Sequence, residues 1–463
     1  MAQAASNPRP ARLAFYGDDF TGSTDALEVL AFAGLKCALF LEPPTPDALA
    51  RLGSFDAVGV AGASRGMQPQ EMDQALPPVL RALAALAPIV HYKVCSTFDS
   101  APAIGSIGRL LQIARAELGC GTVPIVAGNP ALGRYCLFGN LFARSGTDGK
   151  VYRIDRHPIM SVHPVTPMDE ADLGVHLARQ APLNLARLTL ADLAQGREAL
   201  DATLAALLRT APNALLIDGA TAADMTEIGR LLEREAAAHA PLFVVGSSGV
   251  QYALTQWWQP QTAGDGRFAT FGGVDHVLAV SGSASKLTAM QIEAAVNAGF
   301  AEIAVNAREL VDEALWPQAR EALAAKAAAQ LARGRSVILH TARGPDDPRI
   351  EAMIGALVAG GLTREAARHE GGRRLGQRLG WVTHDILARV PLRRLLLCGG
   401  DTSSQVTQVL APQALTVAAR LAPGAPLCRM HAPDTQLHGM EVALKGGQMG
   451  DIEFFERARR GSA

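Results

Sequence analysis

The sequence predicts an α/β protein of two domains, each a mostly parallel sheet flanked by helices. Three observations support this prediction. A chain of 463 residues is long for a single domain. Hydrophobic residues make up 49% and charged residues 19% of it, as in an ordinary globular protein. Short apolar runs alternate with longer helical patterns, which indicates strands joined by helical crossovers.

The first half of the chain carries a series of short apolar runs that we interpret as strands. These runs are continuously apolar rather than alternating, as expected of strands covered on both faces. Helix-forming segments with apolar residues three and four positions apart lie between them, for example at 71–86, 104–118 and 225–239. The predicted strands are residues 13–16, 37–41, 57–61, 89–92, 123–127, 214–218 and 242–246.

The alternating pattern stops after Gln259 and resumes near residue 276. Residues 260–273, PQTAGDGRFATFGG, are rich in Gly, Thr and Ala and lack periodicity, which indicates a linker between domains. We therefore expect a first domain at residues 1–258 and a second at residues 275–463. The second repeats the pattern, with predicted strands at 276–282, 302–306, 336–340 and 395–400 and Ala-rich helices such as 317–333.

Composition and charge exclude several classes of protein. The formal net charge is −1, and a chain that bound nucleic acid along its length would usually be basic, so we expect no nucleic-acid partner. No apolar run approaches the roughly 20 residues that span a bilayer, and the polar N-terminus lacks the core of a signal peptide, so no membrane is expected. Six cysteines without metal-ligand spacing favour a cytoplasmic protein. The oligomeric state stays open, with a homodimer as one alternative.

The first polar constellation is YGDDFTGSTDALE, residues 16–28, at a predicted strand-to-helix turn. Ligands bind beyond the carboxyl ends of strands in a parallel sheet, so this turn lies where a site is expected. Three acids and three hydroxyls are more than one helix cap requires. The alternative is that Asp19 or Thr21 only caps the helix. The polar residues that stand out are Asp18, Asp19, Thr21, Ser23, Thr24 and Asp25.

The second constellation is HYKVCSTFDS, residues 91–100, interpreted as a strand followed by a helix start. Lys93 supplies a positive charge, and Ser96 and Thr97 supply hydroxyls, which together with a helix N-terminus would bind a carboxylate or phosphate. The alternative is that Ser96 or Asp99 caps the helix while Lys93 reaches solvent. Arg65, after another predicted strand, would add a bidentate clamp for a carboxylate.

The third constellation consists of three glycine-rich turns in the second half, SGSAS (281–285), CGGDTSSQV (398–406) and LKGGQMGD (444–451). Glycines, hydroxyls and helix N-termini at such turns suit phosphate groups. The sequence contains no GxxxxGK[ST] motif, which argues against a P-loop enzyme, and lacks GxGxxG at the strand ends. The candidate nucleotide-binding residues are Ser281, Ser283, Gly399, Gly400, Asp401, Thr402, Ser403, Gly446 and Gly447.

At these motifs the sequence resembles the four-carbon acid sugar kinase family over nearly the whole chain. The resemblance runs through DDFTGSTDA, KVCSTFDS, HPVTPMDEADL (163–173), SGSAS, GGDTS and LKGGQMG. It implies a kinase for threonate, erythronate, 3-oxo-tetronate or a relative, with an N-terminal substrate domain and a C-terminal nucleotide domain. Residues 129–142, NPALGRYCLFGNLF, differ from the version in oxo-tetronate kinases, so a branched acid such as 3-oxo-isoapionate is another expected substrate.

The resemblance implies a role for each matching residue. The acid sugar would be bound by Asp18, Asp19, Arg65, Lys93, Ser96 and Thr97, and ATP by Ser281, Gly399, Gly400, Asp401, Thr402 and Gly447. Phosphoryl transfer needs positioning, charge neutralisation by Mg²⁺ and a base for the acceptor hydroxyl. Asp19 is the first candidate base and Asp99 the second, whereas Asp401 would act on the nucleotide side through Mg²⁺ or water. The Mg²⁺ ligands themselves stay open.

Two other functions remain open from the residues alone. One is an ATP-independent aldolase or isomerase that acts on a sugar acid, with Lys93 as a Schiff-base nucleophile. The other is a non-catalytic sensor of sugar acids. Neither gives the glycine-rich turns of the second half a purpose, so we favour a kinase. The sequence does not specify which sugar acid is used or which hydroxyl is phosphorylated.

Overall fold

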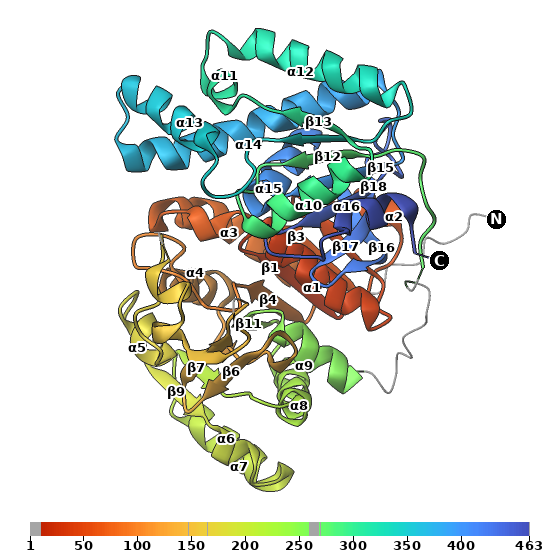
Figure 1. The fold of residues 1–463 in the computed structure, drawn as a ribbon. Helices are drawn as coiled ribbons and strands as arrows, with labels where there is room; N and C mark the ends of the chain where they lie inside the picture. Colours follow the sequence, from red (N-terminus) through yellow and green to blue (C-terminus); the bar gives the residue numbers. More distant parts are fainter. Residues whose placement is uncertain (1–10, 147, 164, 259–267, 269, 463) are drawn as a thin grey trace, which may run out of the picture. The chain divides into compact units, whose positions relative to one another are not determined.

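The computed structural model describes residues 11–146, 148–163, 165–258, 268 and 270–462 (Figure 1). The chain divides into two compact units, which we describe separately. Unit 1 comprises Met1–Ala38 and Glu42–Gly264, and unit 2 comprises Leu39–Leu41 and Asp265–Ala463. Of the expected linker, residues 260–267 and 269 lie outside the described residues, so its character and the predicted domain bounds stay predictions.

Unit 1 contains a parallel sheet in which six of the seven predicted strands appear within a residue or two of their expected bounds. The seventh, residues 37–41, is described with unit 2, and the edge strand at residues 185–188 was not predicted. Its order is β3-β1-β4-β11-β5-β10-β9, with all pairs parallel. The central strands are buried along their length, as their continuously apolar sequences predict. The strands are β1 (Leu13–Gly17), β3 (Ala57–Ala61), β4 (Ile89–Lys93), β5 (Val123–Val126), β9 (Leu185–Leu188), β10 (Ala214–Ile217) and β11 (Leu242–Gly246).

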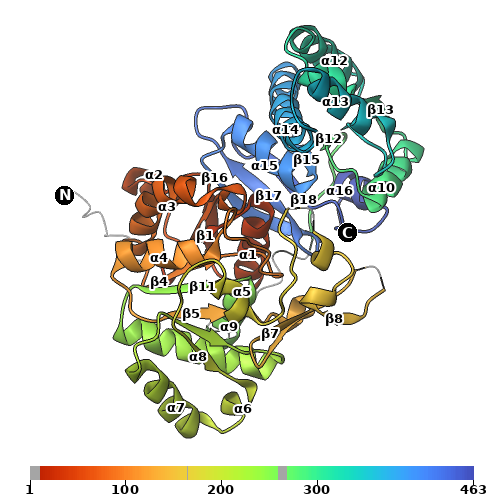
Figure 2. The ribbon, with the colours of Figure 1, turned by 90° about the vertical axis from the view of Figure 1, so that its left-hand side faces the viewer.

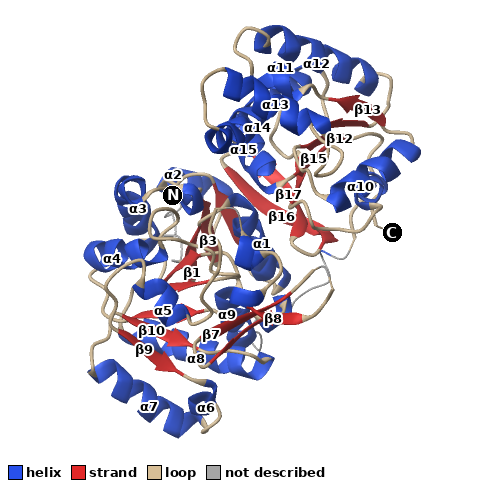
Figure 3. Cartoon of the chain, turned by 60° about the vertical axis from the view of Figure 1, so that its left-hand side comes forward, coloured by secondary structure: helices blue, strands red, loops and turns tan. Residues whose placement is uncertain are grey.

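Helices flank this sheet on both sides (Figure 3). α3 packs against α4 on one side, and α1 and α8 both pack against α9 on the other. The helices of unit 1 are α1 (Phe20–Phe32), α2 (Pro46–Leu52), α3 (Pro69–Ala84), α4 (Ile107–Leu118), α5 (Leu173–Ala178), α6 (Leu190–Leu193), α7 (Arg197–Arg209), α8 (Ala222–Ala238) and α9 (Gly249–Trp258), with 3₁₀ turns η1 (Ser64–Gly66), η2 (Pro130–Leu132), η3 (Ile154–Arg156) and η4 (Met160–Val162).

A second, small antiparallel sheet in unit 1 was not expected from the sequence (Figure 2). It consists of β6 (Arg134–Leu137), β7 (Asn140–Arg144) and β8 (Val151–Arg153). These strands are short and only partly buried, so they lack the apolar run that marks a strand of the main sheet. A tight turn joins β6 to β7, with Phe138 and Gly139 both at positive φ (50° and 77°).

Unit 2 combines a parallel sheet with an antiparallel meander. β13, β14, β12, β15 and β18 are parallel neighbours in that order, and β18, β17 and β16 continue the sheet antiparallel. Leu39 and Phe40 of β2 (Cys37–Phe40) pair antiparallel with Leu415 and Ala414 of β16. The strands are β12 (Leu278–Ser281), β13 (Ala301–Ala304), β14 (Val337–His340), β15 (Arg394–Cys398), β16 (Ala414–Ala422), β17 (Ala425–His431) and β18 (Glu441–Lys445).

The helices of unit 2 also lie on two sides of its sheet (Figure 3). α14 packs against α15 as well as α12 and α13, and α10 packs against α16. An apolar core that includes Phe271, Phe300, Phe454 and Phe455 is buried in the unit. The helices are α10 (Lys286–Asn297), α11 (Ala307–Val311), α12 (Trp316–Leu331), α13 (Pro348–Ala359), α14 (Arg364–Arg389), α15 (Gly400–Leu410) and α16 (Phe454–Arg460).

Candidate active site

The predicted acid-sugar residues of unit 1 gather where three neighbouring strands end. β1 lies between β3 and β4, and Gly17 at its end is in register with Ala61 and Lys93. Asp18 and Asp19 follow β1 directly, and Arg65 lies in η1 just after β3. Because the carboxyl ends of parallel strands share one edge of the sheet, these side chains meet there.

The Arg65 guanidinium links the two carboxylates of this edge. Its Nη2 donates to Oδ1 of Asp18 at 2.7 Å and of Asp19 at 2.9 Å, its Nε to Asp18 Oδ2 at 3.2 Å and its Nη1 to Asp19 Oδ2 at 2.9 Å. Burial works to lower the pKa of Arg65, but the two carboxylates outweigh it and the pKa is raised. Arg65 is therefore already matched by two negative charges before any substrate arrives.

Asp19 serves both as a helix cap and as the more accessible carboxylate. It N-caps α1, accepting from Gly22 N at 2.9 Å, so the capping alternative is real. Its side chain is nevertheless 29% exposed, whereas that of Asp18 is only 7% exposed. A ligand can therefore reach Asp19, while Asp18 lies beneath it. Burial raises the pKa of Asp18, against the opposing charge of Arg65.

Lys93 ends β4 and does not reach solvent, contrary to the alternative considered above. The residue is 3% exposed, and its Nζ donates to the Val94 carbonyl oxygen at 3.1 Å. No described carboxylate forms an ion pair with it. The Cβ that Gly22 lacks would lie 2.6 Å from Nζ, which shows how closely α1 approaches this ammonium group. Lys93 is thus a buried positive charge held at the ligand edge.

The expected helix start at residues 96–100 is wrong. Residues 94–106 form turns and loop, and α4 begins only at Ile107, with Ser106 as its N-cap. The buried Phe98 has a φ of 54°, in the left-handed region, which a right-handed helix does not accommodate. The anion-binding argument from a helix N-terminus therefore does not apply to Ser96 and Thr97.

This turn holds Asp99 inward instead. Asp99 is 7% exposed, and its Oδ1 accepts from Thr97 Oγ1 at 2.6 Å. Burial acts to raise the pKa of Asp99, but the charge of Arg65 and hydrogen bonds from Cys95 and Thr97 outweigh it, and the pKa is lowered. Burial, together with Asp99, raises the pKa of the Cys95 thiol to about 12, so this cysteine stays neutral.

One neighbour of the cluster was missed by sequence reasoning. Arg134, the first residue of β6, donates from Nε to Ser96 Oγ at 3.3 Å. It comes from the small sheet that the sequence did not predict, so no strand-end signal pointed to it. Residues 129–142, which include Arg134, stood out in the sequence as a divergent segment, but Arg134 was given no role.

The predicted nucleotide residues of unit 2 also meet at one edge of their sheet. Ser281 at the end of β12 is in register with Cys398 of β15, which is in register with Lys445 of β18. Gly399 N donates to the Lys445 carbonyl oxygen at 2.9 Å, which joins two of the turns. Gly399 has a φ of 106°, a conformation that favours glycine, and it leads directly into α15.

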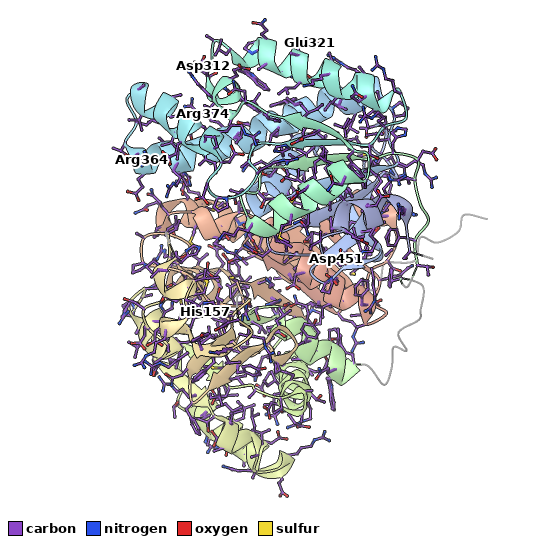
Figure 4. The ribbon with its side chains drawn as sticks, in the orientation of Figure 1. His157, Asp312, Glu321, Arg364, Arg374 and Asp451 are labelled. Carbon is purple, nitrogen blue, oxygen red and sulfur yellow. The ribbon has the colours of Figure 1, made fainter. Side chains whose placement is uncertain are left out.

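The third turn lies against the first. Ser285 Oγ donates to the Gly447 carbonyl oxygen, and Thr288 Oγ1 donates to the same oxygen at 3.1 Å. A Cβ on Gly447 would come within 2.6 Å of Ser283 Oγ, so only glycine fits without a shift. Asp451, labelled in Figure 4, follows this loop and accepts a hydrogen bond from Arg457 of α16.

Hydroxyls and one more lysine line the same strand ends. Ser281 and Ser403 are fully buried, and neither Oγ has a hydrogen-bond partner among the described residues. Asp401 is exposed in the first turn of α15, and Thr402 is buried beside it. Lys445, which sequence reasoning passed over within LKGGQMG, is fully buried and donates to the Gly446 carbonyl oxygen at 3.0 Å. Glycines, helix N–H groups and hydroxyls are therefore gathered where phosphates are commonly bound.

The described residues contain neither a cluster of metal-ligating side chains nor a helix that could span a membrane. No group of three or more His, Cys, Asp or Glu side chains that could hold a metal ion occurs among them. Within the same residues, no helix is long and apolar enough to cross a membrane.

Comparison with known proteins identifies both units. The model of a sugar-binding N-terminal domain matches residues 13–254, and that of a nucleotide-binding C-terminal domain matches residues 278–455. A crystal structure of a Haemophilus influenzae protein of family DUF1537 has the same fold, with a TM-score of 0.69, 22% identity, and coverage of 96% of this chain and 98% of that one. The chain belongs to the four-carbon acid sugar kinase family, as its motifs predicted.

Full-length relatives define the activity. A 3-oxo-isoapionate kinase of Paraburkholderia graminis is 43% identical over 99% of this chain and 96% of its own length. A 3-oxo-tetronate kinase of Methylobacterium radiotolerans is 31% identical over 95% of this chain and 97% of its own. The protein is a sugar-acid kinase, a phosphotransferase that uses ATP and an alcohol group as acceptor. The prediction of a kinase is confirmed, and these relatives give no support to an aldolase or a sensor.

Proposed function

We propose that this kinase phosphorylates a branched sugar acid of the 3-oxo-isoapionate type. The support is the difference in identity, 43% to a 3-oxo-isoapionate kinase against 31% to a 3-oxo-tetronate kinase, both over nearly the full chain. The divergent residues 129–142, which contain β6 and much of β7, agree with a pocket shaped for a different acid.

The observation that carries the proposed site is the accessible Asp19 carboxylate beside the half-buried Arg65 and the buried Lys93. In the proposed complex, the sugar acid lies over the ends of β3, β1 and β4, with a hydroxyl against Asp19. Asp19 accepts the proton of that hydroxyl as it attacks the terminal phosphate of ATP. Lys93, with Ser96 and Thr97, holds the acid, while Arg65 keeps Asp18 and Asp19 in place. Asp99 is a weaker candidate base because it is buried and already bonded to Thr97.

On the nucleotide side, we propose that the three glycine-rich turns hold the phosphates of ATP. Their backbone N–H groups, the dipole of α15 and the hydroxyls of Ser281, Ser283 and Ser403 fit an anion. Mg²⁺ commonly needs only one or two carboxylates when it also binds nucleotide phosphates, and Asp401 is an exposed carboxylate at this edge. When bound, the ion would neutralise charge on the phosphates. We also propose a cytoplasmic location, which is supported by the lack of a disulfide among the six cysteines, all of which lie in the described residues.

A coupled ADP-release assay tests this function. The panel contains 3-oxo-isoapionate, 3-oxo-tetronate, threonate and erythronate, each at several concentrations with ATP and Mg²⁺. We expect the highest kcat/KM for 3-oxo-isoapionate. A higher kcat/KM for 3-oxo-tetronate would overturn the proposed substrate, and no turnover with any acid would overturn the site as well.

A further inference from the structure

The guanidinium of Arg134 is anchored to protein on one side and open on the other. Its Nη1 donates to the carbonyl oxygens of Leu132 (3.0 Å), Gly133 (3.4 Å) and Arg144 (3.1 Å), and its Nε donates to Ser96 Oγ (3.3 Å). Among the described residues, no acceptor lies on Nη2. Five N–H groups are fixed in the guanidinium plane, so anchoring Nη1 and Nε also fixes where the two open N–H groups point.

Arg134 is also a partly buried cation without an acid. Two other partly buried arginines of unit 1, Arg230 and Arg234, each form an ion pair with Asp201 at 2.7 Å. No described carboxylate forms an ion pair with Arg134. Removing a cation from water without supplying an anion is unfavourable, and burial accordingly lowers the pKa of Arg134. An anion bound at Nη2 would relieve this imbalance.

The position of Arg134 joins this open edge to the acid-sugar cluster. Ser96 belongs to the turn after β4 that also carries Thr97. In the same turn, the charge of Arg65 acts to lower the pKa of the half-buried Cys95, and Cys95 acts to raise the pKa of Arg134. Arg65 already contacts two carboxylates through all three of its nitrogens. Of these two arginines, Arg134 is therefore the one whose charge is not paired with a described carboxylate and that can bind a substrate anion.

We infer that Arg134, together with Ser96, binds the carboxylate of the sugar acid. Ser96 Oγ accepts from Arg134 Nε, which leaves its own O–H free to donate. One carboxylate oxygen accepts from Nη2 and the other from Ser96, a two-point contact that fixes the orientation of the acid. Arg134 acts as a positioning and specificity residue, not as the base. This inference rests on the proposed acid-sugar site.

The test compares an acid with its uncharged counterpart. Arg134→Met, Arg134→Lys and the control Arg144→Met are measured in the full chain. Arg144 is an exposed arginine on the adjacent strand and forms no ion pair with the residues that the structure describes. Dissociation constants for erythronate and erythritol, which differ in the carboxylate, are obtained by calorimetry, and the KM for ATP by steady-state kinetics.

We expect Arg134→Met to weaken erythronate binding about tenfold or more, and Arg134→Lys to weaken it less. Erythritol affinity and the ATP KM should change less than about twofold, as should every value for Arg144→Met. An equal loss for erythronate and erythritol would mean a structural role and overturn the inference, as would unchanged erythronate affinity. If Arg134→Met does not fold, Arg134→Lys decides on the same ratio. Failure of the wild-type chain to bind either erythronate or 3-oxo-isoapionate would instead overturn the proposed site.

Discussion

The candidate ligand-binding edges of the two sheets of this kinase differ in the kind of polar groups that line them. At the edge of unit 1, side-chain charges dominate. Arg65 is bound by two carboxylates, while Lys93 and Arg134 form no ion pair with any carboxylate of the described residues. At the edge of unit 2, glycines, buried hydroxyls and helix N–H groups dominate, with Lys445 as a buried charge. This difference agrees with the proposed roles, in which a small, varied acid would be recognised by placed side chains and the constant phosphates of a nucleotide would be bound largely by backbone groups.

The largest expected effect concerns the base in unit 1. Asp19→Asn keeps the size of the side chain but cannot accept a proton, so kcat should fall by about 10²–10⁴. Affinity for the acid should change much less, because the cations remain. Steady-state kinetics measures both quantities, and Asp19→Ala with thermal unfolding reports the separate loss of the helix cap, about 0.5–2 kcal/mol. Near-normal turnover in both variants would remove Asp19 from the mechanism.

A smaller effect is expected from a buried cation of the same edge. Lys93→Met removes a charge-assisted contact to the acid, and such losses commonly amount to about 2–5 kcal/mol. Acid-sugar affinity should therefore fall by more than about tenfold, with ATP affinity retained. Calorimetry with each ligand separates the two. If Lys93→Met binds the acid as tightly as the wild type, the charge-based account of unit 1 is wrong.

Two glycine substitutions compare the edges directly. Gly22→Ala would place a Cβ 2.4 Å from Asp19 Oδ1 and 2.6 Å from Lys93 Nζ, and Gly447→Ala would place one 2.6 Å from Ser283 Oγ. Forcing neighbouring atoms to move to make room for an added methyl group commonly costs about 1–3 kcal/mol. Gly22→Ala should raise the KM of the acid about tenfold and leave that of ATP nearly unchanged. Gly447→Ala should do the reverse, and equal effects of either change on both substrates would contradict the division.

The smallest expected effect is a pH-dependent stability term in unit 1. The pKa of Asp99 is lowered in the folded protein because Arg65, Cys95 and Thr97 outweigh burial. Such a carboxyl stabilises the fold above its ordinary pKa of about 3.9, and this contribution is lost as the pH falls through that value to the folded pKa. Asp99→Asn should thus lower the unfolding free energy by about 1 kcal/mol near neutral pH. In urea titrations the difference from wild type should shrink toward about pH 3. A difference that does not change with pH would contradict this.

The main sheets could be predicted because their strands are buried on both faces and leave apolar runs in the sequence. Leu242–Gly246 and Ala57–Ala61 are such strands, and both bounds were right. β6, β7 and β8 could not be predicted, since partly buried short strands leave no such run. The helix start expected within residues 91–100 was wrong because propensity does not reveal that Phe98 adopts positive φ.

The candidate site was predictable to the same extent. Asp18, Asp19, Arg65 and Lys93 follow strands of the main sheet, so topology alone brings them together. Arg134 comes from the small sheet and Lys445 from a motif whose glycines drew attention first, so neither was assigned. What the sequence also could not indicate is which cation is already neutralised, because that depends on the contacts of Arg65 with both aspartates.

Because of Leu39–Leu41, the C-terminal half of the chain does not contain the whole of unit 2. These residues belong to unit 2, although more than two hundred residues of unit 1 separate them from the rest of it. A fragment that starts at residue 275 would leave Ala414 and Leu415 without their antiparallel partners in β2, and an exposed edge strand invites aggregation. Chimeras that exchange only the C-terminal half between relatives would therefore need a compatible pair at Leu39 and Phe40 from the other parent.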